Sequence, residues 1–412
     1  MTPAGVTQAI PARSEVDARL AASPGLGWEA LALLRGATVA IIGLGALGGP
    51  LGMHLACLGI ALVLIDSDVI AAANLGNQLW DAKAVGEEKS GARARQLAAF
   101  NPECSIVPIT ARIEDLGLAA LAGVDLLVTG LDGRAARLRV AELSLRLGIP
   151  WVDGGVDGSG SMLRGTVTVF DPRMPDAPCY GCRLDGADLQ AIAKEGRGPG
   201  CPSWRTERRS LTPPTLQASA FAGVIAGYQA IVASRVLLGC PGDLAGKQLV
   251  VACDGTPQVR ALGLTPNPRC LVGHYRFEPL RAVAGEQVGD LLAAGARELG
   301  APVERLGLHG RLLALGLGCP RCGAVRDLVR VAEMVSDAEA TCACGAEMVP
   351  EELAGEVSAG RAASWAARTW ADLGVPAADV VTVWAGGSEA HYMVNVPGAT
   401  ASGVAGTAEG PA

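Results

Sequence analysis

Short apolar runs alternate with longer amphipathic segments from residue 37 to about residue 155. Short, uniformly apolar runs are typical of buried strands, whereas apolar positions at helical spacing are typical of helices. The pattern predicts strands at 37–43, 60–66, 104–112, 124–132 and 149–155, and helices at 46–59, 88–100 and 134–148. Because strands and helices alternate, we expect an α/β fold with a doubly wound, mainly parallel sheet.

The second half of the chain is less regular. Residues 164–170 predict a further strand that can run antiparallel, and 172–214, rich in proline, glycine and cysteine, predicts a loop. The remaining predicted elements are helices at 216–239 and 285–300 and strands at 247–254, 382–386 and 390–396. We expect a helical N-terminal segment (1–35), an α/β domain (36–279), a C-terminal α+β domain (280–397) and a disordered tail (398–412).

The composition is that of a folded protein with a large core, which excludes a disordered or fibrous chain. Of the 412 residues, 50% are hydrophobic and 18% are charged. The 34 basic and 41 acidic residues give a net charge of −7, which provides no general attraction to nucleic acid or to an anionic membrane.

Two uncharged stretches, 37–65 and 210–234, exceed the ~20 residues that a membrane span needs. Glycines and Pro50 interrupt the first, and Pro213 and Pro214 interrupt the second. We therefore expect a strand–turn–helix unit and a buried helix, with no membrane contact. The first residues lack the basic start and apolar run of a signal peptide, so we expect a cytoplasmic protein with reduced cysteines.

Gly43, Gly45 and Gly48 form a G-x-G-x-x-G pattern that follows one predicted strand and opens a predicted helix. Glycines there let the backbone approach a phosphate, and the helix N-terminus supplies positive potential. Asp66 ends the next strand, where a carboxylate can accept hydrogen bonds from a ribose. These residues predict a nucleotide site that suits NAD, FAD and ATP equally. The alternative is a tight turn in an α/β domain that binds no ligand.

Further short motifs follow Asp66 in a definite order. A D-x-D pair at 66–68 precedes N-L-G-N-Q at 74–78 and V-G-E-E-K at 85–89. Later motifs are T-G-L-D at 129–132 followed by Arg137, P-C-Y-G-C at 178–182 and N-P-R-C at 267–270. In this order they resemble the motifs of the ThiF/MoeB/HesA family of ubiquitin-activating-enzyme-like adenylyltransferases, over residues 15–275.

The resemblance implies a Rossmann-like adenylation domain and gives roles to its residues. Asp66 would hold the ATP ribose, Lys89 the phosphates and Asp132 a Mg²⁺ ion. The other residues that would line the nucleotide site are Asp68, Asn74 and Gln78. The alternatives are a solvated helix residue for Lys89 and a turn residue at the end of a strand for Asp132.

Two further positions bear on this resemblance. Asn77 stands where the family has an arginine, so one phosphate contact is missing or comes from another residue. Arg19 precedes Gly43 by 24 residues, near where family members often carry an arginine that reaches into the partner subunit's site. The resemblance thus implies a homodimer with Arg19 acting across it. A surface arginine on an amphipathic helix is the alternative.

Cysteine spacing predicts metal sites, because disulfides are disfavoured in a reducing compartment. Cys179 and Cys182 form a C-x-x-C knuckle. In the family a second C-x-x-C completes the site, and here Cys270 and His274 stand in its place. A Cys₃His set is an ordinary tetrahedral zinc site.

A second cluster lies in the C-terminal part and consists of Cys319, Cys322, Cys342 and Cys344. It approximates a zinc ribbon whose second knuckle is C-x-C, one residue short. Two local sites use all eight ligands, whereas a rival pairing of 179/182 with 319/322 leaves four ligands without partners. Four ligands leave no open position, so we expect structural Zn²⁺ at both sites and a zinc-ribbon-bearing C-terminal appendage. Unliganded thiols are the alternative.

Cys201 lies in a G-P-G-C-P loop between the first knuckle and the long apolar helix. Family members that form thioesters place their cysteine in this crossover loop, and Arg205, Arg208 and Arg209 would favour a thiolate here. An ordinary loop cysteine is the alternative. The remaining cysteines, which we expect in the core because apolar segments surround them, are Cys57, Cys104, Cys240 and Cys253.

These expectations combine into one function. The resemblance implies an enzyme that would use Mg-ATP to adenylate the C-terminal carboxylate of a small ubiquitin-like or sulfur-carrier protein, after which Cys201 would take the acyl group. A conjugating enzyme would be a further partner. The alternatives are adenylation of a peptide or small carboxylate without a thioester, an inactive nucleotide-binding scaffold, which Asn77 favours, and an NAD-dependent oxidoreductase.

Overall fold

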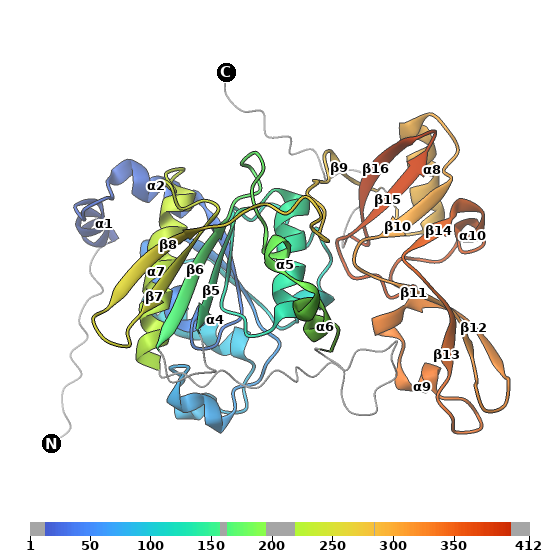
Figure 1. Ribbon diagram of the computed structural model, residues 1–412, viewed down its shortest axis with the longest axis horizontal. Coiled ribbons are helices and arrows are strands. Elements are labelled where there is room, and N and C mark those ends of the chain that lie inside the picture. Colours follow the sequence, from blue (N-terminus) through green and yellow to red (C-terminus); the bar gives the residue numbers. More distant parts are fainter. Residues whose placement is uncertain (1–12, 157–162, 195–218, 284, 397–412) are drawn as a thin grey trace.

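The computed structural model describes residues 13–156, 163–194, 219–283 and 285–396. Its largest sheet has eight strands in the order β3-β2-β1-β4-β5-β6-β7-β8 (Figure 1). The strands are β1 (Thr38–Ile42), β2 (Ala61–Ile65), β3 (Ile106–Ile109), β4 (Leu126–Thr129), β5 (Trp151–Val156), β6 (Arg164–Phe170), β7 (Lys247–Ala252) and β8 (Gln258–Gly263). The first five strands in chain order are parallel, and β6, β7 and β8 extend the sheet in antiparallel pairs.

Helices cover the two faces of this sheet unequally. One face carries α2 (Trp28–Gly36), α3 (Gly48–Leu58), α4 (Lys89–Phe100) and α7 (Ser219–Leu237), and the other carries α5 (Arg134–Leu147). On β1, Val39 and Ile41 face the first group while Ala40 and Ile42 face α5. Burial on both faces explains why the central strands are uniformly apolar.

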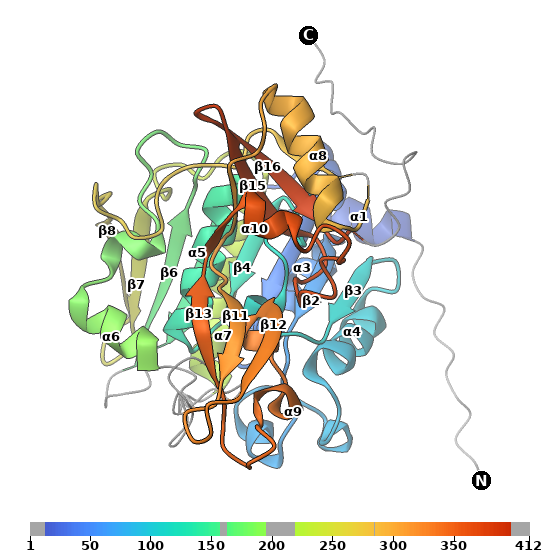
Figure 2. The ribbon, with the colours of Figure 1, turned by 90° about the vertical axis from the view of Figure 1, so that its right-hand side faces the viewer.

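The C-terminal part contains two smaller sheets, which lie beside the α5 face of the large sheet (Figures 1 and 2). A five-stranded sheet in the order β14-β10-β15-β16-β9 carries helix α8 (Val288–Leu299), and a three-stranded sheet has the order β12-β11-β13. Their strands are β9 (Leu280–Ala282), β10 (Arg305–Leu308), β11 (Leu313–Gly318), β12 (Val325–Val331), β13 (Val349–Ala354), β14 (Glu356–Ser358), β15 (Asp379–Ala385) and β16 (Ser388–Val394).

Short helices complete the described elements. They are the α-helices α1 (Arg13–Ala21), α6 (Gly186–Lys194), α9 (Asp337–Ala340) and α10 (Ala359–Ala363), and the 3₁₀ helices η1 (Ala72–Gly76), η2 (Ala82–Ala84), η3 (Ile113–Asp115), η4 (Tyr180–Arg183) and η5 (Ala332–Met334).

A buried ion pair fixes the C-terminal part to the large sheet. Asp379 is 1% exposed and accepts hydrogen bonds from Arg311 Nε at 2.6 Å and from the Leu118 backbone N–H at 2.9 Å. Arg311 also donates to the Leu116 carbonyl at 2.8 Å. A Cβ on Gly117 would lie 2.3 Å from the Ala377 carbonyl oxygen, so the two backbones are in close contact.

Helix α7 is the one helix among the described residues that is long and apolar enough to cross a membrane, by length and composition alone. It packs on α3 and β5, and its Phe221, Ile225 and Ala226 belong to the core of the large sheet. These contacts agree with the buried helix predicted from its sequence.

The structure corrects two predictions. Part of 172–214, expected to be a loop, forms η4 and α6. Cys57 and Cys240, expected in the core, are exposed, whereas Cys104 is buried. Cys57 lies near the end of α3, where Leu55 and Ala56 take the buried positions instead.

Candidate active site and metal centres

The glycine loop connects β1 to α3 and has no space for side chains at two of its glycines. Gly43 has φ +86°, and a Cβ there would lie 2.8 Å from the Gly130 carbonyl oxygen. A Cβ on Gly48 would lie 1.9 Å from the Gly43 carbonyl oxygen. The remaining glycine of the pattern, Gly45, faces the Gln78 side-chain amide, and a Cβ on Gly45 would lie 3.4 Å from it. The N-terminus of α3 thus approaches the end of β4 closely, as a phosphate-binding turn requires.

Asp66 follows β2 and holds the glycine loop. Its Oδ2 accepts the Leu44 backbone N–H at 2.7 Å, and its Oδ1 accepts the Asp68 N–H at 2.8 Å. Burial raises the pKa of Asp66, while the charge of Lys89 and the two backbone donors oppose that rise. The carboxylate is therefore already oriented, and each oxygen has a further lone pair for a ligand hydroxyl.

Lys89 begins α4 and pairs with Asp68. Its Nζ lies 2.9 Å from Asp68 Oδ2, and its backbone N–H donates to the Asp68 carbonyl at 2.9 Å. The side chain of Lys89 is 7% exposed, so it is not the solvated helix residue of the alternative interpretation. It lies beside Asp66, whose pKa its charge lowers.

Residues 71–80 lie beside the glycine loop and form one wall of the proposed nucleotide site, with the glycine loop as the other. Asn74 caps its own turn, because its Oδ1 accepts the Ala71 N–H at 2.9 Å. Gln78 Oε1 accepts from Trp80 Nε1 at 3.1 Å, while the Gln78 amide nitrogen faces Gly45. Asn77, in place of the family arginine, is half-buried and brings no charge.

Asp132 is exposed in the loop after β4, and this loop adjoins the glycine loop. The preceding Leu131 side chain is 3.3 Å from where a Gly43 Cβ would lie, and Arg137 donates to the Leu131 carbonyl. Arg137 Nε also donates to the buried Asp153 at 3.2 Å. Asp153 is a residue that the sequence analysis missed, and with Arg137 it holds the loop that carries Asp132.

Arg93 is a second residue that the sequence analysis missed. It is fully buried one turn after Lys89, and it donates to the Gln78 carbonyl at 3.0 Å and to the Leu44 carbonyl at 3.4 Å. The signal was the four-residue spacing of Lys89, Arg93 and Leu97, all of which are buried on α4. Such spacing places residues on one helix face.

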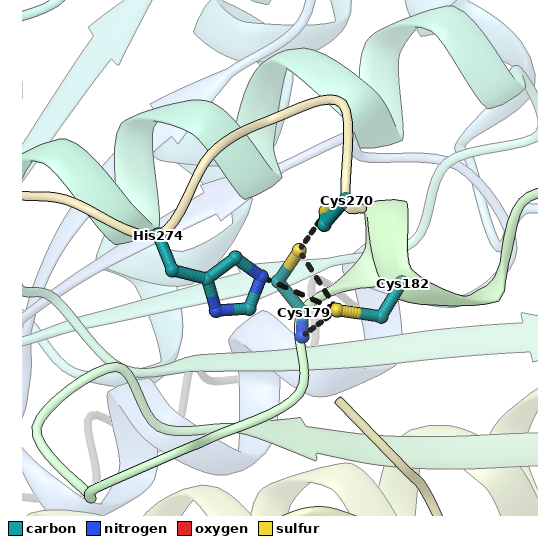
Figure 3. A group of neighbouring side chains, drawn as sticks. All are labelled: Cys179, Cys182, Cys270 and His274. Atoms are coloured by element: carbon teal, nitrogen blue, oxygen red, sulfur yellow. Dashed lines mark hydrogen bonds between the residues drawn. The ribbon is translucent and has the colours of Figure 1, made fainter. Parts of the chain in front are cut away.

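The first predicted metal site is assembled from the two distant motifs (Figure 3). Cys179 Sγ lies 3.8 Å from Cys182 Sγ and 3.5 Å from Cys270 Sγ, and His274 Nε2 lies 3.2 Å from Cys182 Sγ. Ligand atoms about 2.3 Å from a tetrahedral zinc ion are about 3.8 Å apart, so this donor set fits Zn²⁺. Burial raises the pKa of the Cys179 thiol, so metal binding would release a proton.

Two residues around this group hold its four side chains in position. A Cβ on Gly181 would lie 2.5 Å from Val272 and 3.1 Å from Cys270 Sγ, so the knuckle requires glycine there. Arg146 of α5, which the sequence analysis missed, donates to the Gly273 carbonyl at 2.9 Å and the Tyr275 carbonyl at 3.0 Å. It thereby fixes the turn that carries His274.

The second predicted metal site lies beside the three-stranded sheet, in the connection from β11 to β12 and in the segment before β13. Cys319 Sγ is 3.6 Å from Cys344 Sγ, and Cys322 Sγ is 3.5 Å from Cys342 Sγ. The eight side chains therefore form two local groups, and the rival pairing of 179/182 with 319/322 is wrong because these pairs lie in separate groups. The C-x-C knuckle fits because the Gly345 N–H donates to the Cys342 carbonyl at 2.8 Å and closes a tight turn.

The last two predicted catalytic residues are Arg19 and Cys201. Arg19 is exposed on α1, which packs on α2 through an ion pair of Asp17 and Arg35. Cys201 and the neighbouring arginines 205, 208 and 209 lie outside the described residues.

The fold and the site define a nucleotide-binding α/β protein with a glycine loop, an acidic strand end and a buried lysine. The sequence model of the ThiF family matches residues 18–272, and the chain belongs to the ThiF family.

Its relatives are named as adenylyltransferases or as an activating enzyme. The molybdopterin-synthase adenylyltransferase of Salmonella typhimurium is 30% identical over 253 residues, which span 60% of this chain and 91% of that protein. The SAMP-activating enzyme E1 of Haloferax volcanii is 31% identical over 160 residues, which span 38% of this chain and 57% of that protein. Among solved structures, Escherichia coli MccB with ATP is 22% identical with a TM-score of 0.46, over 59% of this chain and 68% of that one.

Proposed function

We propose that the protein is an ATP-dependent adenylyltransferase that activates the C-terminal carboxylate of a small ubiquitin-like or sulfur-carrier protein. Its family and the names of its relatives support this proposal. The observation that carries it is the convergence of the glycine loop, Asp66 and buried Lys89 beside the loop of Asp132. A hydride-transferring enzyme would not need the buried lysine or the metal knuckle.

The residues divide the work of a carboxylate attacking the α-phosphate of ATP. Asp66 accepts the ribose hydroxyls, and the glycine loop and Lys89 neutralise phosphate oxygens, which reduces repulsion of the incoming carboxylate. A new bond forms between carboxylate oxygen and α-phosphorus, and the bond to the pyrophosphate oxygen breaks. A Mg²⁺ ion held by Asp132 would stabilise the leaving pyrophosphate. Cys201 would then attack the acyl adenylate and release AMP.

We assign Zn²⁺ to both cysteine groups and propose structural roles for them. The first group joins the η4 segment after β6 to the segment between β8 and β9, and the second would form a zinc ribbon. The ribbon belongs to residues 280–397, which we propose as a separate domain because most of their buried apolar residues form two clusters of their own. Metal-ligating thiols suit a reducing compartment, and we propose a cytoplasmic location on that ground.

A homodimer is the assembly that the surface favours. Trp28 and Leu33 of α2 are 63% and 56% exposed, and Ile231 of the adjoining α7 is 61% exposed. Large apolar side chains gathered on neighbouring helices mark interaction surfaces. In such a dimer, the exposed Arg19 would be available to the partner's nucleotide site.

The test is detection of the adenylate itself. Incubation with Mg-ATP and a small ubiquitin-like or sulfur-carrier protein that ends in Gly-Gly should join AMP to the terminal carboxylate of that carrier, as measured by intact mass. A truncated carrier without the two glycines is the control. Cleavage of ATP without any adduct on the intact carrier would contradict the proposed substrate class.

A further inference from the structure

Arg93 lies directly behind the glycine loop, in a space that the surrounding residues leave for it. Its guanidinium carbon lies 3.8 Å from the centroid of the Trp80 ring. A Cβ on Gly49 would lie 2.5 Å from Arg93 Nη2, so the neighbouring helix position must be glycine for the guanidinium to fit. Complete burial of an arginine side chain is costly unless its N–H groups have hydrogen-bond partners, so the burial of Arg93 points to a specific role.

The contacts of Arg93 join two walls of the proposed nucleotide site. Its Nη2 donates to the Gln78 carbonyl at 3.0 Å and the Leu44 carbonyl at 3.4 Å, and its Nη1 donates to Gln96. Leu44 is therefore held on both sides, because its N–H donates to Asp66 and its carbonyl accepts from Arg93. The glycine loop and the 71–80 segment are fixed relative to each other by this one side chain.

Arg93 also brings a charge to this position. Burial lowers the pKa of Arg93 to about 10, while the charge of Asp66 opposes that decrease, so the guanidinium is a cation at neutral pH. Lys89 stands one turn earlier on the same helix. Water is excluded around the fully buried guanidinium, so its field is screened less than that of an exposed arginine.

We infer that Arg93 is a positioning residue that sets the glycine loop against the 71–80 segment and attracts ligand phosphates through the loop backbone. This inference rests on the proposed function, since it concerns the same nucleotide site. It also accounts for Asn77, because a buried cation already lies next to this segment. If Arg93 acts through its charge, removing it should weaken the binding of ligands more strongly the more phosphate charge they carry. If Arg93 only holds the structure, all ligands should lose affinity equally.

The experiment compares the affinities of the full-length protein for adenosine, AMP and ATP by calorimetry at low salt. Arg93→Gln should weaken ATP binding roughly tenfold and AMP binding less, and leave adenosine binding within about twofold. Arg95→Gln, which removes an exposed arginine two positions along the same helix, should leave all three affinities unchanged. Equal losses for the three ligands, or no loss, would overturn the inference.

A second variant covers the case in which Arg93→Gln does not fold. Arg93→Lys keeps the charge and loses the forked hydrogen bonds, so the ratio of ATP to adenosine affinity should stay near the wild-type value while thermal stability falls. A collapse of that ratio in Arg93→Lys would contradict the inference, as would a wild-type protein that binds no ATP. Failure of adenylation alone would appear separately, as wild-type protein that binds ATP but forms no adenylate.

Discussion

Lys89 and Asp68 form an ion pair of 2.9 Å in which the lysine side chain is 7% exposed and the aspartate side chain 66% exposed. The cation is fixed by burial, whereas its partner faces solvent and can turn away at little cost. In the proposed reaction, a phosphate of ATP would therefore replace Asp68 as the partner of Lys89 without unfolding any element.

Lys89→Met should lower carrier-dependent ATP–pyrophosphate exchange by roughly 10²- to 10³-fold, because one donor to the developing charge is lost. Lys247→Met, which removes a lysine paired with the exposed Asp243, is the matched control and should retain full exchange. Near wild-type exchange by the Lys89 variant would mean that this lysine has only a structural role.

Metal analysis should find two zinc ions per chain, one for each cysteine group. Cys270→Ala should retain one zinc and lower the free energy of unfolding by about 3 kcal/mol or more, because binding of a structural metal contributes to folding. Cys240→Ala, which removes an exposed cysteine outside both groups, should keep both ions. A Cys270 variant with two zinc ions and an unchanged Tm would refute the first site.

Cys201→Ala should keep pyrophosphate exchange and lose a DTT-sensitive adduct with the carrier. The reason is that thiol attack follows adenylation and needs a nucleophile that zinc does not occupy. Cys57→Ala, at an exposed cysteine on α3, is the control. Persistence of the adduct in the Cys201 variant would assign the acyl group to another cysteine.

The apolar surface of α2 and α7 should mediate dimer formation. Ile231→Glu should produce monomers in sedimentation experiments, since a carboxylate would be buried without a partner. Val325→Glu, which changes an exposed apolar residue of β12, should remain dimeric.

Mixing Arg19→Ala with Lys89→Ala protein should recover part of the activity if the arginine acts across the dimer interface. Wild-type monomers at micromolar concentration would exclude both ideas.

Local patterns were sufficient to predict the glycine loop with its acidic strand end and the two groups of cysteine and histidine side chains. The glycine loop and Asp66 were predictable because a strand, a tight turn and a helix follow each other directly in sequence. The knuckles were predictable from cysteine spacing, although Cys179 and Cys270 lie 91 residues apart.

Other features depend on contacts that no local pattern records. The four-residue spacing of Arg93 with Lys89 and Leu97 gave only a weak signal, and Arg146 looks like a solvated helix residue in the sequence. Both arginines are buried because carbonyls from distant segments accept their N–H groups. Strands β10 to β14 escaped prediction because glycines or charged residues interrupt their apolar positions, as in β11 (L-A-L-G-L-G) and β12 (V-R-D-L-V-R-V). The pairing of these two strands also shifts register between Leu315 and Leu317. Asp153 lies within strand β5 and gave no signal apart from being a charged residue inside an apolar strand.

The central claim is that this site adenylates a carrier carboxylate, and ATP–pyrophosphate exchange measures that step directly. The wild-type protein with its Gly-Gly-terminated carrier should exchange labelled pyrophosphate into ATP, and Asp132→Ala should reduce the rate by more than about 10²-fold. Asp243→Ala, at a carboxylate that is 82% exposed and far along the chain, should exchange at the wild-type rate. Carrier-independent exchange, or full exchange by the Asp132 variant, would contradict the account.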